Sequence, residues 1–169
     1  MDLETFRTKQ GPYKDLYARD ADAALLTLKA RGTADTAAVT CKVETGRGLA
    51  IAGIHPKVGG SGAELCSGDM LLEALVACAG VTLKSVATAV EVPLKQGNVI
   101  AEGDLDFRGT LGVDKEAPVG FAEIRLRFEV ATDAPKDKLD LLLKLTERYC
   151  VVYQTIKNGP KVSVSMKRI

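Results

Sequence analysis

The stretch that decides the fold is residues 66–90, CSGDMLLEALVACAGVTLKSVATAV. Its apolar residues fall on every side of a helical wheel: Met70, Leu71, Leu72, Leu75, Val76, Val81, Leu83, Val86 and Val90. A helix that is apolar all round is typical of the buried centre of a protein. Polar residues interrupt the run at Asp69, Glu73, Thr82 and Lys84. These interruptions favour a long central helix and argue against a membrane span.

Cys78 lies in the middle of this predicted helix, among the small residues Ala77, Ala79 and Gly80. Small neighbours leave room for another backbone or a ligand to approach the sulfur. We therefore expect the chemistry of the protein at this position.

Length and charge describe an ordinary soluble protein. The chain has 169 residues, which fits one domain over 1–169, and a net charge of +1 with 27% charged residues. This near-neutral balance of charge does not indicate a protein that binds nucleic acid or an anionic membrane. The N-terminus, MDLETFRTKQ, has no apolar leader segment, so the sequence predicts a cytoplasmic protein.

The cysteine and histidine content predicts reduced thiols and no metal site. The four cysteines, Cys41, Cys66, Cys78 and Cys150, contain no CxxC pair. In a chain of this length they do not form the disulfide framework of a small secreted protein. The single histidine, His55, precedes Pro56 in a predicted turn. The paired ligand spacing of a zinc site is absent, and we expect neither a metal nor another cofactor.

On the N-terminal side we predict one amphipathic helix followed by a hairpin. The helix covers 13–31 and ends before Gly32. Alternating apolar and polar residues predict a strand over 37–45, and a returning strand follows over 49–54. Gly46, Arg47 and Gly48 make the turn between them. The Gly-rich segment 55–65 lacks the Lys-Ser/Thr ending of a phosphate loop, so we interpret it as a connection.

On the C-terminal side the pattern predicts more strands and a second helix. Alternation over 98–111 and 122–132 indicates paired antiparallel strands with one solvated face. Pro135 opens a helix over 136–149, whose apolar stripe is Leu139, Leu142, Leu143 and Thr146. A short helical turn and a last strand over 161–169 complete the chain. Two blocks of strands divided by a long buried helix predict an α+β fold, with antiparallel sheets around that helix.

This order of parts resembles the OsmC/Ohr family, the osmotically inducible and organic hydroperoxide resistance proteins. The resemblance covers about 37–169 and rests on DMLLEALVAC at 69–78 and ERYC at 147–150, followed by a turn and a last strand. Residues 1–36 lie outside it as an N-terminal helical extension. The resemblance implies an OsmC-like fold and an intertwined homodimer with two sites at the subunit interface.

The resemblance also implies a function and its residues. Peroxidase members of the family reduce organic hydroperoxides with a cysteine pair, which here implies a peroxidatic Cys78, a resolving Cys150 and a dithiol or lipoyl-type reductant. Arg47 matches the glycine-flanked arginine of the family's first hairpin turn, and Asp69 lies near its helix-start acid. The chain departs from the family in having Val151–Tyr153 after the second cysteine, where Pro and small residues are usual.

The chemistry explains why these residue types are needed. A peroxidatic cysteine must be a thiolate, and apolar burial disfavours that form, so a nearby cation is required. Arg47 would supply the charge, and Asp69 or Glu73 would hold its guanidinium. Each residue also has a plainer interpretation. Cys78 can be a small buried hydrophobe, Cys150 an inert helix-end cysteine, Arg47 a solvated turn residue and Asp69 a helix-start charge.

The other two cysteines are interpreted as packing residues. Cys66 lies twelve residues before Cys78, so the two are separated by about 18 Å along one helix and cannot bridge within it. Cys66 could instead reach a site across a dimer interface. Cys41 alternates inward with Val39 and Val43.

Two other functions remain open on the sequence alone. The first is a non-catalytic member of the same fold that binds a small molecule, with Cys78 kept for packing. The segment CVVY favours it, because Tyr153 could fill the space that a resolving reaction requires. The second is a purely structural dimeric module. Reduction of cumene hydroperoxide with a dithiol donor, compared with hydrogen peroxide, would separate these functions from a peroxidase.

Overall fold

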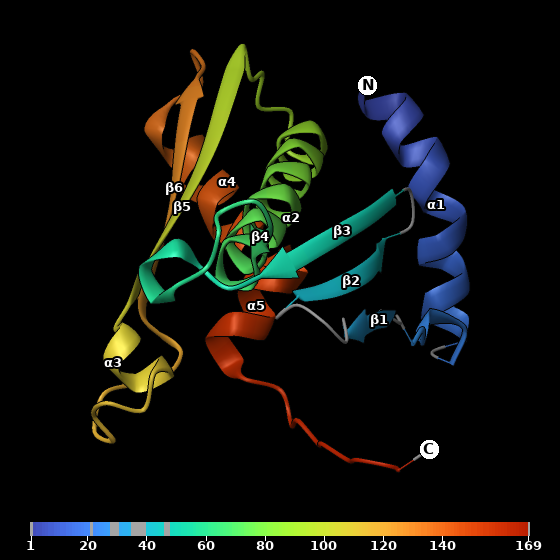
Figure 1. The fold of residues 1–169 in the computed structure, drawn as a ribbon. Coiled ribbons are helices and arrows are strands. Elements are labelled where there is room, and N and C mark those ends of the chain that lie inside the picture. Colours follow the sequence, from blue (N-terminus) through green and yellow to red (C-terminus); the bar gives the residue numbers. More distant parts are fainter. Residues whose placement is uncertain (1, 21, 28–30, 35–39, 46–47, 169) are drawn as a thin grey trace. The chain divides into compact units, whose positions relative to one another are not determined.

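The structure is a computed structural model that describes residues 2–20, 22–27, 31–34, 40–45 and 48–168. Figure 1 labels its helices and strands. The chain divides into two compact units. Unit 1 is Met1–Ala74 with Ile100–Arg127, and unit 2 is Leu75–Val99 with Phe128–Ile169. Helix and strand together make the mixed α+β fold that the sequence predicts.

Unit 1 contains a four-stranded sheet in the order β1-β2-β3-β4. Its strands are β1 Arg31–Ala34, β2 Thr40–Thr45, β3 Gly48–Gly53 and β4 Leu65–Cys66. β2 and β3 are antiparallel, with Cys41 opposite Ala52, while β3 and β4 are parallel. The predicted hairpin is thus confirmed within the described residues. Its turn residues, 46–47, lie outside them, and β1 was not predicted.

The first helix lies earlier in the chain than the pattern predicts. α1 runs from Leu3 to Arg19, and Asp2 caps it by accepting a hydrogen bond from the Thr5 N–H at 2.8 Å. At its other end the Asp20 carboxylate accepts the N–H groups of Asp22 and Ala23, at 3.1 and 3.3 Å. These bonds favour the short 3-10 turn Asp22–Ala24 over a continued α-helix. The prediction of a helix over 13–31 is therefore wrong for the described residues after 19, which are 20, 22–27 and 31.

The paired strands β5 and β6 confirm most of the second strand block. β5 is Gln96–Leu105 and β6 is Phe121–Ala131, and they form a two-stranded sheet. The prediction for β5 is wrong after residue 105. There Asp106 accepts the Arg108 N–H at 3.0 Å and caps a short helix, α3 Phe107–Thr110. On the exposed face of the pair, Arg125 donates to Asp104 at 2.7 Å, as expected for a solvated face.

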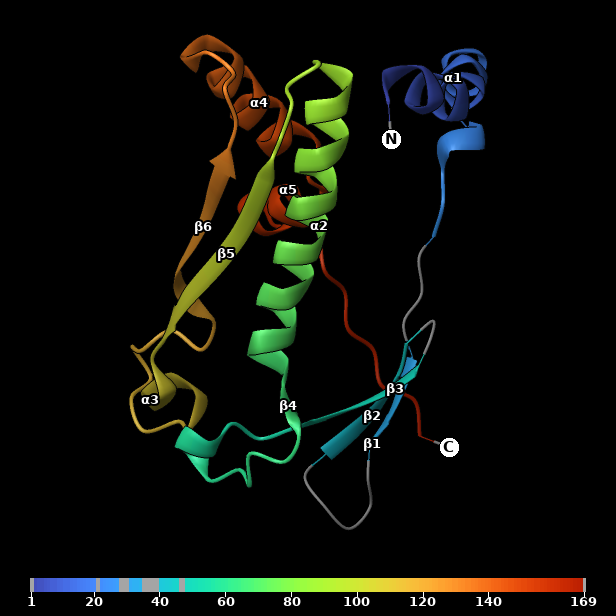
Figure 2. The same cartoon turned by 90° about the horizontal axis from the view of Figure 1, so that it is seen from above.

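The hydrophobic core that positions the candidate site belongs to unit 2. It is formed by α2 (Ser67–Ala89), α4 (Lys136–Tyr149) and the part of the strand pair that lies in this unit. Its buried members are Leu83, Val86, Ala87, Val92 and Leu142. Figure 2 shows the later turns of α2 beside α4. The C-terminal half of α2 is therefore held by side chains that are distant in sequence.

The prediction that α2 is buried on every side is wrong for the single chain. Its buried residues lie on one face: Leu75, Ala79, Leu83, Val86 and Ala87. On the other side Leu71 is exposed, and Val81 is 69% exposed. By length and composition α2 would also fit a membrane span. Core helices of soluble proteins pass the same test, and α2 contributes to a core here.

The second helix agrees with its predicted bounds, 136–149. Its buried residues are Leu142 and Thr146, whereas Leu143 is exposed. Including Leu143 in the apolar stripe was therefore wrong. The following turn is a full helix, α5 Val151–Asn158, which ends at Gly159 with a φ of 54°.

The last predicted strand, 161–169, does not form within the described residues. Residues 160–168 are coil after α5 (Figure 1), and the side chains of Val162, Val164 and Met166 are exposed. Alternation of apolar and polar residues predicts a strand only if another strand supplies its hydrogen bonds. In the described part of this single chain, no strand pairs with this segment.

Candidate functional site

Cys78 is held in the middle of α2 by neighbours that allow close packing. The next residue, Ala79, is fully buried, and Cys78 itself is half-buried. A Cβ atom at Gly80 would lie 3.7 Å from a methyl group of Val99 in β5. The small residues around Cys78 therefore let β5 approach this part of the helix.

Cys150 occupies the junction between two helices. It is the C-cap of α4 and the N-cap of α5, and it is 1% exposed. Its N–H donates to the Thr146 carbonyl at 3.0 Å, and its carbonyl accepts from the Gln154 N–H at 2.9 Å. The first N–H groups of α5 have no partner within their own helix, so they are available to the sulfur atoms beside them.

The structure brings Cys78 and Cys150 together, although they are 72 residues apart in the sequence. Both belong to unit 2, both are free thiols, and each side chain lies close enough to the other to shift its pKa. The core contact between α2 and α4 contributes to this meeting, since it joins the C-terminal half of α2 to Leu142, eight residues before Cys150.

Hydrogen bonding favours the ionised form of Cys78. Partial burial raises its pKa and is the largest single influence. The N–H of Val152, the Cys150 thiol, the N–H of Val151 and the Thr82 hydroxyl act in the opposite direction. Together these donors lower the pKa of Cys78 below that of an ordinary thiol. A larger fraction of Cys78 is therefore thiolate near neutral pH.

The pKa of Cys150 moves in the opposite direction. Burial raises it most, and the hydrogen bond and charge of Cys78 raise it further. The N–H groups of Tyr153 and Val152 only partly offset these effects. The pair thus consists of one thiol that ionises readily and one that keeps its proton.

Three of these donors were not found by reasoning from the sequence. They are the N–H groups of Val151 and Val152 and the Thr82 hydroxyl, which also bonds to the Cys78 carbonyl at 2.8 Å. A threonine four residues after a helical cysteine was a usable signal, because the two lie on one helix face. The amide donors carry no side-chain signal and depend on the start of α5.

Arg47 and Asp69 are the charged residues predicted for the site. Arg47 lies outside the described residues, so its predicted role stays a prediction. Asp69 is exposed in the first turn of α2. It precedes Cys78 by nine residues, or about 14 Å along the helix axis. Any effect of Asp69 on Cys78 would therefore pass through a third group. In the sequence analysis this third group is the guanidinium of Arg47.

Cys66 and His55 have local contacts in unit 1. A Cβ atom at Gly68 would lie 3.7 Å from the Cys66 sulfur, consistent with packing. The His55 ring stacks on Phe107 at 5.2 Å, and its Nδ1 accepts the Lys57 N–H at 3.0 Å. Within the described residues no group of His, Cys, Asp and Glu side chains is arranged to hold a metal ion.

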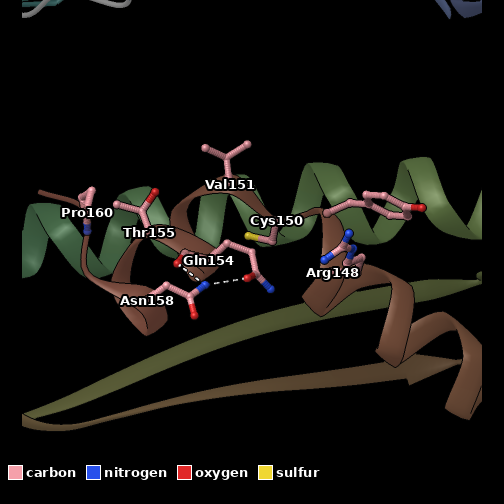
Figure 3. Close-up of a pocket in the computed structure, with 8 residues that line it drawn as sticks. Arg148, Cys150, Val151, Gln154, Thr155, Asn158 and Pro160 are labelled. Atoms are coloured by element: carbon pink, nitrogen blue, oxygen red, sulfur yellow. Dashed lines mark hydrogen bonds between the residues drawn. The ribbon is translucent and has the colours of Figure 1, made fainter. Parts of the chain in front are cut away.

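A pocket of about 500 Å³ opens beside Cys150. Figure 3 shows Cys150 at the helix junction, with Asn158 hydrogen-bonded to Gln154 on one side of it. The residues that line the pocket all belong to unit 2: Arg148, Tyr149, Cys150, Val151, Gln154, Thr155, Asn158 and Pro160. The second cysteine is thus part of the wall of this pocket, although its own side chain is buried.

Sequence and structure comparisons agree on the relatives of this chain. The family model of the OsmC-like protein matches residues 60–165, which include both cysteines. The chain belongs to the OsmC-like protein family. No curated protein matches the sequence significantly. The family is soluble, so α2 is its core helix and not a membrane span.

Solved structures of OsmC-like proteins have the same fold. One from Mycoplasma pneumoniae is 15% identical, with a TM-score of 0.65, over 79% of this chain and 89% of the other. An organic hydroperoxide resistance protein OsmC from Legionella pneumophila is 14% identical, with a TM-score of 0.61, over 80% and 93%. One from Elizabethkingia anophelis, also an organic hydroperoxide resistance protein, is 14% identical, with a TM-score of 0.62, over 80% and 91%. At these identities the likeness establishes the fold.

Proposed function

We propose that this OsmC-like protein is a cysteine-based peroxidase that reduces organic hydroperoxides. The observation that carries the proposal is the adjacent pair of Cys78 and Cys150, with the pKa of the first lowered and that of the second raised. Pairs of groups whose surroundings separate their pKa values are typical of active sites. Two similar structures are named organic hydroperoxide resistance proteins, which supports this reaction class.

The proposed reaction uses each cysteine once. The Cys78 thiolate attacks the hydroperoxide, the O–O bond breaks, and Cys78 becomes a sulfenic acid. Cys150 then attacks the Cys78 sulfur and forms a disulfide, releasing the oxygen as water. A dithiol or lipoyl-type reductant restores both thiols. Such a cycle suits a cytoplasmic protein, because reducing compartments keep thiols free.

The surroundings of the pair support an organic substrate. Val81 on α2 and Val151 on α5 are each 69% exposed, and Ala77 is exposed one residue before Cys78. These apolar side chains would bind a hydrocarbon group, which hydrogen peroxide lacks.

The binding-only alternative has less support. The segment CVVY favours it, because Tyr153 could fill the space that a resolving reaction requires. The cysteine side chains contact each other, and the Tyr153 ring instead lies 5.4 Å from the Lys157 ammonium group. Arg47 and Asp69 remain proposed contributors to the site, through a charge on Arg47 that stabilises the Cys78 thiolate.

The direct test treats the reduced protein with one equivalent of cumene hydroperoxide. We expect a Cys78–Cys150 disulfide in the peptide mass map, and faster turnover with cumene hydroperoxide than with hydrogen peroxide when a dithiol is supplied. If the protein yields neither this disulfide nor a Cys78 sulfenic acid trapped by dimedone, the peroxidase proposal fails and the binding function replaces it.

A homodimer is part of the same proposal. The exposed apolar face of α2, including Ala77 and Val81, lies beside the half-buried Cys78. The coil after Gly159 has the alternation of a strand but no strand partner in the described part of the chain. A second copy would cover both features, in an intertwined pair that buries more than about 2,000 Å².

Replacing Val81 with Glu should convert the dimer to a monomer, because an unpaired charge would be buried in the interface. Sedimentation at micromolar concentration measures the change. Lys144→Gln is the control, since it also makes the chain more negative by one charge but at an exposed position on α4. A wild-type chain that sediments as a monomer contradicts the homodimer.

A further inference from the structure

We propose that the Cys150 thiol is the general acid of the first step and protonates the alkoxide that leaves when Cys78 attacks the hydroperoxide. This inference rests on the proposed function and gives Cys150 a second role, before it resolves the sulfenic acid. It assigns the source of a proton that the reaction requires.

The requirement comes from the leaving group. When the Cys78 thiolate bonds to the terminal oxygen of an alkyl hydroperoxide, the O–O bond breaks and the other oxygen leaves as an alkoxide. An alkoxide is a much stronger base than a thiolate, so a nearby proton donor lowers the barrier. A donor must lie within hydrogen-bond reach of the reacting atoms, directly or through one water.

Cys150 meets this requirement better than the other donors beside Cys78. The described residues bring four donors to the Cys78 sulfur: the Val151 and Val152 N–H groups, the Thr82 hydroxyl and the Cys150 thiol. Of these four, only a thiol ionises within a few pH units of neutrality. Cys150 is 1% exposed, and burial together with the adjacent Cys78 thiolate raises its pKa, so it keeps its proton until the reaction begins.

The surroundings of Cys150 also stabilise the thiolate that Cys150 becomes when it loses its proton. The N–H groups of Tyr153 and Val152 are directed at its sulfur and favour its ionised form. The charge of Cys78, which disfavours that form, disappears when Cys78 becomes a sulfenic acid. Losing its proton therefore prepares Cys150 for the second step, in which a thiolate is the nucleophile.

The two steps balance. In the first, the Cys78 thiolate, the hydroperoxide and the Cys150 thiol give the Cys78 sulfenic acid, an alcohol and the Cys150 thiolate. The peroxide gains two electrons and the Cys78 sulfur loses two. In the second, the Cys150 thiolate attacks the Cys78 sulfur, the S–S bond forms, and hydroxide leaves and takes a proton from solvent.

The test compares Cys150→Ala and Cys150→Ser with the wild type in single turnovers that measure formation of the Cys78 sulfenic acid. With cumene hydroperoxide, Cys150→Ala should be slower by about a hundredfold, the usual contribution of a general acid. With peracetic acid the loss should be less than about threefold, because a carboxylate leaves without needing a proton. Cys150→Ser should be as slow as Cys150→Ala with cumene hydroperoxide, because a serine hydroxyl, like that of Thr82, does not ionise near neutral pH.

Rates are compared at a pH where Cys78 is fully ionised in each variant, located from the pH dependence of its alkylation by iodoacetamide. This separates proton donation from the hydrogen bond by which Cys150 stabilises the thiolate. Equal losses with both oxidants, or no loss with either, would overturn the inference while leaving the peroxidase intact. If the wild type forms no sulfenic acid with either oxidant, the proposed function itself fails.

Discussion

Cys78→Ser is expected to abolish consumption of cumene hydroperoxide, with a loss of at least about a thousandfold. A serine hydroxyl does not ionise near neutral pH, so the donors around position 78 have no anion to stabilise. The substitution is close in size, and residue 78 is only half-buried, so the fold should be retained. Steady-state peroxide consumption with a dithiol donor measures the effect, and circular dichroism checks the fold.

Cys66→Ser is the matched control. Cys66 is also a half-buried free cysteine, but it lies in unit 1 at the end of β4. We expect its replacement to change the rate by less than about twofold. A Cys78→Ser variant that keeps a tenth or more of the wild-type rate would remove Cys78 from the site. A large loss in Cys66→Ser would show that a residue assigned to packing takes part.

Leu142→Ala is expected to lower the free energy of unfolding by about 3 kcal/mol, within the range for buried leucines. Leu142 is 2% exposed and belongs to the core that joins α4 to α2. Its removal leaves a cavity where the two helices meet. Because this contact brings Cys150 to Cys78, disulfide formation should also become slower.

Urea denaturation at fixed protein concentration measures the loss, and Leu141→Ala provides the comparison. Leu141 is the preceding residue on the same helix but is 40% exposed. Its replacement should cost less than about 1 kcal/mol. Equal losses in the free energy of unfolding at positions 141 and 142 would contradict the structure, in which Leu142 is buried in the core and Leu141 is exposed.

Local patterns in the sequence predict most of the elements. The bounds of α4 follow from Pro135 and its helical spacing, and strand alternation over 122–132 predicts β6. Local rules fail where a side chain redirects the backbone. Asp20 ends the first helix early, and Asp106 turns the end of β5 into a short helix. Such polar side chains compete with the regular hydrogen bonds of helices and strands.

The apolar pattern shows which residues avoid water but not what covers them. α2 is apolar on every side, yet the single chain buries only one face of it. The coil 160–168 has the alternation of a strand without the partner that a strand requires in the described part of the chain. Covering the exposed face of α2 and pairing the coil 160–168 both depend on contacts with other segments or another chain. Neither periodicity nor composition describes such contacts.

By itself the sequence determined the long apolar helix, its central Cys78, the second helix that ends at Cys150, and the α+β class. Only the tertiary structure decided that the two sulfur atoms meet and that the start of α5 directs N–H groups at both. The physical reason is that helix and strand periodicities are set by neighbours along the chain. The pKa of a thiol is set by whichever donors and charges packing brings to it, and here these include residues more than 70 positions away.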